Sequence, residues 1–268
     1  CQTSHVLYKC RDRINTDMMI PIKIVNTISP ELVNNVIRST NRQTQVLDEA
    51  FESLKEFHKQ LQEYYETYSG EDRLYYERRS HEFDEEKRLR RYNVITLPVQ
   101  LQAFMSMFLE EPHSMHRYYG ELLRANKNRL FQNGHQLIAY YTSAKTLQCV
   151  EKALNNGSID MKWRYYRYHI LLLIQTFLRK INGIKFVPAP TSKDMNRFCT
   201  SILKIVNDEK NLDIVLQASI HHIDKTLEEQ KSKSRLSNGP ERTKEFTMAL
   251  LANVDQTITK VEKWNKCI

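Results

Sequence analysis

The stretch DEAFESLKEFHKQLQEYYETYSG, residues 48–70, is the most informative part of this chain for its fold class. Apolar and aromatic side chains recur in it every three or four positions, at Phe51, Leu54, Phe57, Leu61, Tyr64, Tyr65 and Tyr68. That spacing places them on one face of an α-helix. Asp48 is suited to cap the start of this helix, and Gly70 to end it. The stretch therefore predicts an amphipathic helix with one face buried against a core.

The helical period continues through most of the remaining chain. It is found over residues 97–109, 137–154, 163–181, 192–206, 212–229 and 242–264, which are separated by polar, Gly- or Pro-containing segments and by Asn211. Residues 18–28 (MMIPIKIVNTI) predict a strand, and residues 74–77 predict a short edge strand. We therefore expect a mainly α chain with a small β portion. A short α/β unit over residues 1–93 would precede a multi-helix domain over residues 94–268.

The composition is that of a folded globular protein with a basic balance. Of 268 residues, 41% are hydrophobic and 27% charged, and 40 Lys and Arg against 32 Asp and Glu give a formal net charge of +8. A basic chain favours an anionic partner such as nucleic acid. No apolar run in the sequence approaches the roughly 20 residues that span a bilayer, so we expect no membrane partner.

The cysteines bear on the cellular compartment of the protein, and the first residues bear on whether further sequence precedes them. The five cysteines form no CxxC pair, which argues against a zinc site or a disulfide framework and favours the reducing cytoplasm. The sequence opens on Cys1 with neither an initiator Met nor a signal-peptide pattern. We expect that an N-terminal portion precedes it.

Enzyme signatures such as a Walker A loop, HExxH, GxSxG or a Gly-rich dinucleotide fingerprint are absent from the sequence. A weaker signal of a functional site is the polar run STNRQTQ at residues 39–45, which contains Asn41, Arg42 and Gln43. Arginine forks and amides hydrogen-bond phosphates and base edges. Gln2 and Thr3 open a predicted helix whose N-terminal amides attract anions. A buried polar network that ties the loop to the strand is the structural alternative.

Arginines stand beside tyrosines in YYERR, residues 75–79, and in WRYYRYH, residues 163–169. Aromatic stacking combined with phosphate pairing is how single-stranded nucleic acid is commonly held. The first run supplies Arg78 and Arg79 as ligand-binding candidates and Glu77 as a candidate catalytic carboxylate. On an amphipathic helix, the second run is more typical of core tyrosines flanked by arginines that reach the surface.

His113 and His116 are three residues apart, and on a helix they would share a face. Together with a third ligand such as His135 they are candidates for a metal site. Because Pro112 precedes the pair, a hydrogen-bonded cluster at a helix start is the alternative.

Several motifs, in this order, resemble the abortive infection phage resistance (AIPR) family. Gln2-Thr3-Ser4 is similar to the end of the family's Asn-Gly-x-Gln-Thr motif. The strand at residues 18–28 and the motifs TNRQTQV (40–46), FESL (51–54) and YYERRS (75–80) follow in the family's order, and residues 112–120 are similar to a block of close members. The resemblance covers the first half of the chain and fits the C-terminal portion of the family. It implies a bacterial anti-phage defence role.

A weaker similarity links the order of helix start, strand, helix and Asn-containing turn to DGQHR and ParB-like domains, which handle nucleotides or DNA. Thr3-Ser4 replaces the His-Arg of that motif, which favours binding over nucleotide hydrolysis.

We therefore expect a cytoplasmic defence protein that binds nucleic acid or a nucleotide through Gln2, Thr3, Asn41, Arg42, Gln43, Arg78 and Arg79. One alternative is a nuclease or nucleotide-hydrolysing effector, active in the full-length protein, in which Glu77 acts as general base or metal ligand. The other is that the helical half is a protein-interaction module for a defence partner. The sequence specifies no cofactor.

Overall fold

The computed structural model describes residues 8–9, 11–13, 55–78, 82–83, 89–232, 239–255 and 257–258. The chain divides into two compact units, Cys1–Gln45 and Val46–Ile268. In the first unit the described residues include the short 3-10 helix η1 (Arg11–Arg13). The strand predicted at residues 18–28 and the start of the helix predicted from Asp48 lie outside the described residues.

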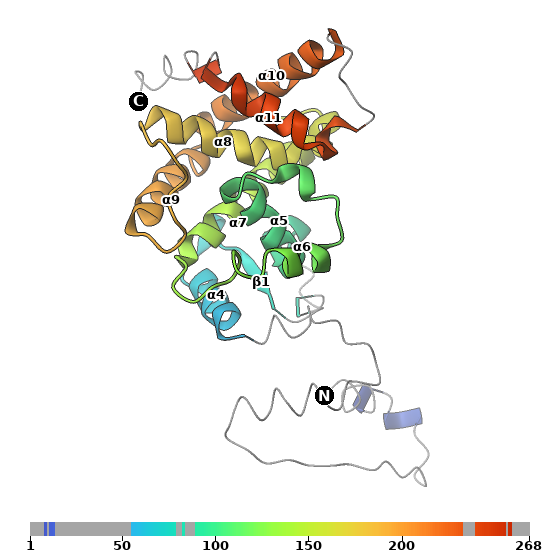
Figure 1. Cartoon of the computed structure of the whole chain (residues 1–268). Coiled ribbons are helices and arrows are strands. Elements are labelled where there is room, and N and C mark those ends of the chain that lie inside the picture. The colour runs from blue at the N-terminus through green and yellow to red at the C-terminus, as the bar shows by residue number, and fades with distance from the viewer. Residues whose placement is uncertain are drawn as a thin grey trace. The chain divides into compact units, whose positions relative to one another are not determined.

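The second unit is built from helices and two short strands (Figure 1). In chain order its elements are α4 (Glu56–Glu66), η2 (Gly70–Asp72), β1 (Tyr75–Glu77), η3 (Arg91–Asn93), β2 (Val94–Thr96), α5 (Leu97–Phe108), η4 (Pro112–Ser114), α6 (Tyr119–Ala125), α7 (Leu137–Asn155), η5 (Met161–Tyr166), α8 (Arg167–Ile181), α9 (Lys193–Val206), α10 (Glu209–Ser232), η6 (Pro240–Arg242) and α11 (Lys244–Ala252). The predicted fold class, mainly α with a small β portion, is confirmed.

The two strands form a parallel pair, with Tyr75 opposite Val94 and Glu77 opposite Thr96. Tyr76 and Ile95 at the middle of each strand are buried, and their neighbours are half-buried. The edge strand predicted at residues 74–77 is therefore present as β1. Its partner β2 was not predicted, because three residues that lead directly into a helix are too short to show a strand period.

The core is centred on α5, α7 and α8, which pack against one another, while α9 covers α7 and both α10 and α11 contact α8 (Figure 1). In α8, residues 170–174 are almost fully buried, as expected for a helix surrounded by others. Phe57 and Leu61 of α4 and Tyr76 of β1 belong to the same core as Leu101 of α5. The short sheet therefore shares its hydrophobic core with the helices. The domain boundary expected after residue 93 stays a prediction.

Side-chain caps are present at the starts of α9, α10 and α11. Ser192 Oγ accepts a hydrogen bond from the Met195 N–H, which fits the helix predicted over residues 192–206. The predicted break between this helix and the next is present, but it lies at Asn207 and Asp208 and not at Asn211, since α10 begins at Glu209. Asp208 precedes this helix, and its carboxylate accepts the Asn211 N–H at 2.8 Å. Asn211 thus belongs to the first turn of α10 and does not interrupt it.

Tyr140 of α7 organises an aromatic cluster in the core. Its ring stacks on Phe104 of α5 with centroids 4.2 Å apart and lies 5.2 Å from the ring of Phe131. Its hydroxyl accepts the backbone N–H of Phe131 at 2.7 Å and lies 2.9 Å from His135 Nδ1. Phe131 has a backbone φ of +51°, a left-handed conformation that is uncommon outside glycine. The hydroxyl of Tyr140 therefore anchors a strained turn to the core.

Cys149 of α7 and Cys199 of α9 are both buried as free thiols. Burial raises the pKa of Cys149 to about 11 and that of Cys199 to about 12. The Cys149 thiol contacts the carbonyl oxygen of Val206 at the end of α9. Both side chains thus contribute to the helical packing as small hydrophobic groups.

Candidate functional site

The predicted polar site draws on three parts of the chain, of which one is described in part. Glu77 and Arg78 lie within the described residues, whereas Gln2, Thr3, Asn41, Arg42, Gln43 and Arg79 lie outside them. The described part of the predicted site is therefore the end of β1.

Glu77 and Arg78 lie at the carboxyl end of the parallel strand pair. Glu77 is the last residue of β1 and is paired with Thr96, the last residue of β2. Helix α5 begins at the next residue, Leu97. In parallel sheets, ligands bind beyond the carboxyl ends of the strands, where the positive ends of the following helices also lie. Glu77 and Arg78 thus occupy the edge of the sheet that is suited to a polar ligand.

Arg78 is held in place by a residue of α4 and by the turn that follows β1. Its Nε donates to Gln62 Oε1 at 3.1 Å, and its backbone N–H donates to Glu82 Oε2 at 3.2 Å. Gln62 Nε2 in turn donates to Glu82 Oε1 at 3.2 Å. We call these three residues the Arg78 clasp. The clasp fixes the orientation of the guanidinium group, which lowers the entropic cost of pairing it with an anion.

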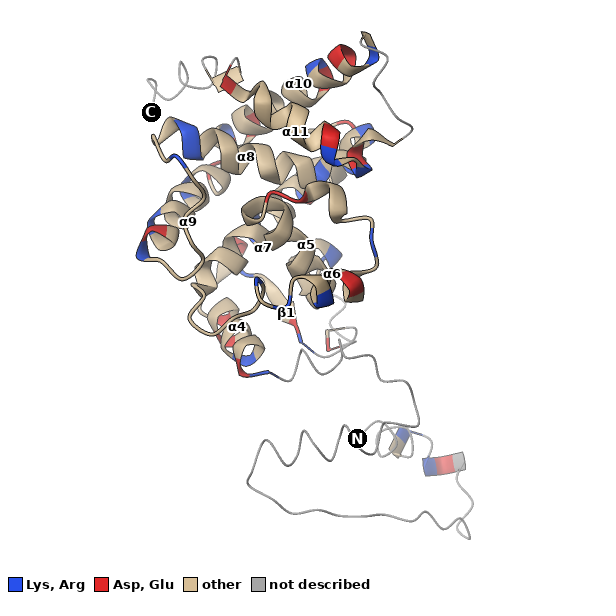
Figure 2. Cartoon of the chain, in the orientation of Figure 1, with Lys and Arg blue, Asp and Glu red and all other residues tan. Residues whose placement is uncertain are grey.

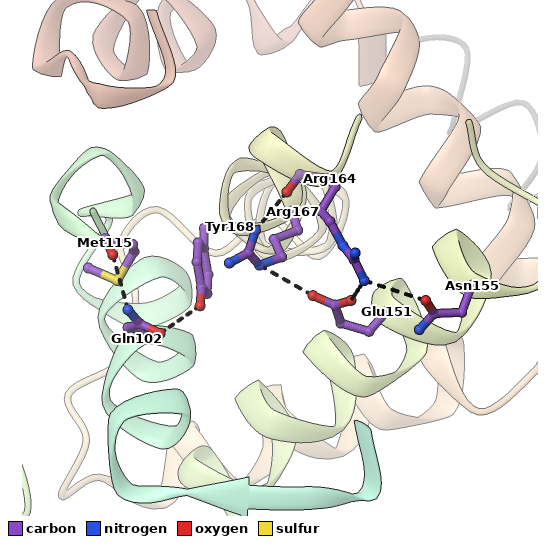
Figure 3. A network of polar contacts seen from close by, with 7 residues as sticks. All are labelled: Gln102, Met115, Glu151, Asn155, Arg164, Arg167 and Tyr168. Atoms are coloured by element: carbon purple, nitrogen blue, oxygen red, sulfur yellow. Dashed lines mark hydrogen bonds and ion pairs between the residues drawn. The ribbon is translucent and has the colours of Figure 1, made fainter. Parts of the chain in front are cut away.

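The arginines in the second aromatic run, residues 163–169, are engaged in ion pairs (Figure 3). Arg164 Nη2 and Arg167 Nε each lie 3.3 Å from a carboxylate oxygen of Glu151 on α7. Arg164 also donates to Asn155 Oδ1 at 3.4 Å. One carboxylate thereby ties η5 and the start of α8 to α7.

Of the three tyrosines in this run, Tyr168 is part of the core, whereas Tyr165 is 63% exposed. The Arg167 guanidinium lies 4.6 Å from the ring centroid of the buried Tyr168, whose hydroxyl donates to Gln102 Oε1 at 2.7 Å. Gln102 Nε2 completes the network by donating to the Met115 carbonyl at 3.0 Å (Figure 3). This geometry favours the structural alternative, in which core tyrosines are flanked by arginines that reach the surface.

His113 and His116 follow the end of α5, with His113 inside the short 3-10 helix η4. Partial burial lowers the pKa of both imidazoles, and His113 Nδ1 lies 3.3 Å from Thr247 Oγ1 of α11. Within the described ranges, no three His, Cys, Asp or Glu side chains are gathered where they could share a metal ion. The hydrogen bond to Thr247 fits the alternative of a hydrogen-bonded cluster.

A polar cleft between α7, η2 and the start of α10 was missed by the sequence analysis. It has a volume of about 590 Å³ and contains Lys145, whose side chain is 6% exposed. Lys145 Nζ donates to the Glu71 carbonyl at 2.8 Å and lies 3.2 Å from Asp72 Oδ1. A signal was present in the sequence, because Lys145, Gln148 and Lys152 follow helical spacing and so share one face of the predicted helix.

The charges of the helical unit are interspersed. Figure 2 shows basic and acidic positions mixed along the same helices. Among the described helices, none combines the length and the apolar character needed to cross a lipid bilayer.

Comparison with known proteins gives one match. The family model described as AIPR protein matches residues 1–252 of the chain. No curated protein and no solved structure matches it.

Proposed function

Because this chain belongs to the AIPR protein family, which connects it with abortive infection and phage resistance, we propose that it is a bacterial, cytoplasmic defence protein that binds nucleic acid or a nucleotide. The proposed binding residues are Gln2, Thr3, Asn41, Arg42, Gln43, Arg78 and Arg79. Arg42, Arg78 and Arg79 would pair with phosphates, and the amides would contact a base or fix the loop.

The observation that carries this proposal is the Arg78 clasp at the carboxyl end of the parallel strands. Arg78 follows Glu77 at the point where β1 ends, and α5 begins directly after the paired strand. The bond from Arg78 Nε to Gln62 orients the guanidinium group. An oriented arginine beside a helix start suits a phosphate oxygen, and the net charge of +8 assists the approach of a polyanion.

Binding is preferred over hydrolysis because Glu77 is the one carboxylate of the proposed set. In the hydrolase alternative, Glu77 would act as general base or metal ligand and the arginines would stabilise the developing phosphate charge. Loss of nuclease activity in Glu77→Gln full-length protein, with nucleic-acid affinity retained, would favour that alternative.

In the second alternative the helical part binds a defence protein, and stable co-purification with a neighbouring gene product would favour it.

Replacing Arg78 by Ala is expected to weaken the binding of labelled single-stranded DNA about five- to tenfold at low salt, because one phosphate contact is lost. The slope of log affinity against log salt should fall by about one unit. Fluorescence anisotropy with single-stranded DNA, duplex DNA and RNA at two salt concentrations measures both quantities.

Arg124→Ala is the matched control, since Arg124 lies on α6 with an exposed side chain, away from the proposed sites, and its removal changes the net charge equally. It should bind nearly as the wild type does. Equal weakening by both substitutions would attribute binding to overall charge, and wild-type affinity in Arg78→Ala would remove Arg78 from the proposed site. Thermal unfolding of both variants checks that they are folded.

A further inference from the structure

A hollow lies away from the end of β1, between the end of α5 and the segment that joins α8 to α9. It has a volume of about 410 Å³, within the about 300–1,000 Å³ range of small-ligand sites. Five of the residues that line it are Arg129, Arg179, Lys185, Glu110 and Phe186. Three of these are cationic and one is acidic, so the hollow favours an anion.

Arg179 is the most firmly placed of the three cations. Its side chain is 12% exposed, and Nη1 donates to the Lys185 carbonyl at 2.6 Å. The same bond fixes the backbone beside Phe186. Arg129 lies on the same hollow and pairs through Nη1 with Glu111 at 2.7 Å. Because the protein's own contacts orient these two guanidinium groups, they form a preorganised binding site for a phosphate.

Glu110 is the acidic residue in the lining, and its carboxylate competes with a ligand phosphate for Arg179. Its carboxylate lies 3.5 Å from Arg179 Nη2, at the outer limit of a hydrogen bond. The backbone of Glu110 has a φ of +57°, and the N–H groups of Leu109 and Glu111 on either side both donate to the Met105 carbonyl. The chain reversal that ends α5 therefore holds Glu110 in position, and a ligand phosphate would displace a weak contact with Arg179.

Phe186 provides an aromatic surface beside the cations. It is 73% exposed, the highest value among the large hydrophobic side chains of the described residues. Lys185 Nζ lies 5.6 Å from its ring centroid. Phe186 also borders a neighbouring hollow of about 620 Å³, and Arg197 is among the residues that line it. An exposed ring with cations around it is the arrangement on which nucleic-acid bases stack.

We propose that this hollow binds a nucleotide unit, either free or within a single strand, with its phosphate at Arg129 and Arg179 and its base against Phe186. The ligand class is that of the proposed function and rests on it, but the residues are separate from Glu77 and Arg78. Substitutions in the hollow and substitutions at Arg78 therefore test the two sites independently.

The test measures the anisotropy of a labelled oligothymidylate with the full chain and three variants. Phe186→Ala is expected to weaken binding about tenfold through the loss of base stacking, and Arg179→Gln by a similar factor through the loss of a phosphate partner. Glu110→Gln is expected to strengthen binding about threefold, because a competing carboxylate is removed. Tyr118→Ala, an exposed aromatic, and Glu121→Gln, an exposed acid on α6, are the controls and should bind as the wild type does.

Competition with unlabelled ligands separates the two sources of the nucleotide unit. Competition by AMP identifies free nucleotides as ligands of the hollow, and competition by unlabelled oligonucleotide alone identifies a strand. Inorganic phosphate competing as well as AMP would overturn the assignment of a base to Phe186.

Wild-type affinity in Phe186→Ala, or no strengthening in Glu110→Gln, would also overturn the proposal. If Arg78→Ala weakens binding in the same assay while Phe186→Ala does not, the proposed function stands and this second site is rejected. Because Phe186 is mainly exposed, its variant tests the site even if Arg179→Gln fails to fold.

Discussion

Replacement of Tyr140 by Ala is expected to lower the free energy of unfolding by about 3–5 kcal/mol, the usual cost of removing a large aromatic ring from a core. Tyr140 is fully buried, and its ring stacks on Phe104 and Phe131. Its hydroxyl also accepts the N–H of Phe131, which has a left-handed backbone conformation. Denaturant unfolding followed by circular dichroism measures the change.

Tyr140→Phe separates the contribution of the hydroxyl from that of the ring. It is expected to cost about 1–3 kcal/mol, because the buried N–H of Phe131 loses its acceptor while the aromatic stacking is retained. A cost below about 1 kcal/mol for Tyr140→Ala would contradict the central place of this ring in the core. Equal costs for the two variants would assign the whole effect to the hydroxyl.

Substitution of His169 by Leu is expected to remove much of the acid sensitivity of the fold. His169 of α8 is buried against Tyr166 and Phe246, and both of its ring nitrogens are without a hydrogen-bond partner among the described residues. Burial, with smaller contributions from His113 and His116, lowers the pKa of His169 from 6.5 to about 3. The folded protein therefore keeps this imidazole neutral at pH values where the unfolded chain protonates it.

The sign of the effect follows from proton linkage. Below pH 6.5 the unfolded state binds a proton that the folded state does not, so stability falls as the pH falls from 6.5 toward 3. At pH 5 the loss from His169 amounts to about 2 kcal/mol, at about 1.4 kcal/mol per pH unit. His169→Leu should lack this loss and, because a buried polar group without partners is removed, should be about 1 kcal/mol more stable at pH 8.

His222→Leu is the matched control, since His222 is also buried but has both ring nitrogens engaged. Nδ1 lies 2.8 Å from Thr257 Oγ1, and Nε2 lies 2.8 Å from the Leu250 carbonyl. This variant is expected to lose about 2 kcal/mol at pH 8, because both partners are left buried without a bond. An unchanged dependence of stability on pH in His169→Leu would assign the acid sensitivity to the other histidines with lowered pKa, such as His113 and His135.

The elements that could be predicted from the sequence are those in which burial repeats with a fixed period. Helix α5 matches the prediction over residues 97–109, and α7 matches that over residues 137–154. The strand β2 and the helix α6 were not predicted, because three and seven residues are too few to establish a period. The predicted helix at residues 163–181 begins as the 3-10 helix η5, a difference of geometry that apolar spacing does not encode.

The side-chain partners within the candidate sites were beyond prediction, because they join distant parts of the chain. Arg78 was identified from its aromatic neighbours, but its partner Gln62 lies 16 positions away, on helix α4. Likewise, Arg179 and Glu110 are 69 positions apart and meet only through the packing of α8 against α5. Residue type indicates which groups are suited to phosphate, whereas tertiary packing decides which of them are already paired.

The burial of Cys149 and Cys199 gives the α7–α9 interface a built-in chemical probe. A thiol reacts with disulfide reagents as the thiolate, and at neutral pH the raised pKa values leave almost none of that form in the closed protein. Modification of these two side chains therefore proceeds through transient separation of the helices. Its rate measures how often α7 and α9 come apart, and binding of a ligand that stabilises the closed form would slow the labelling.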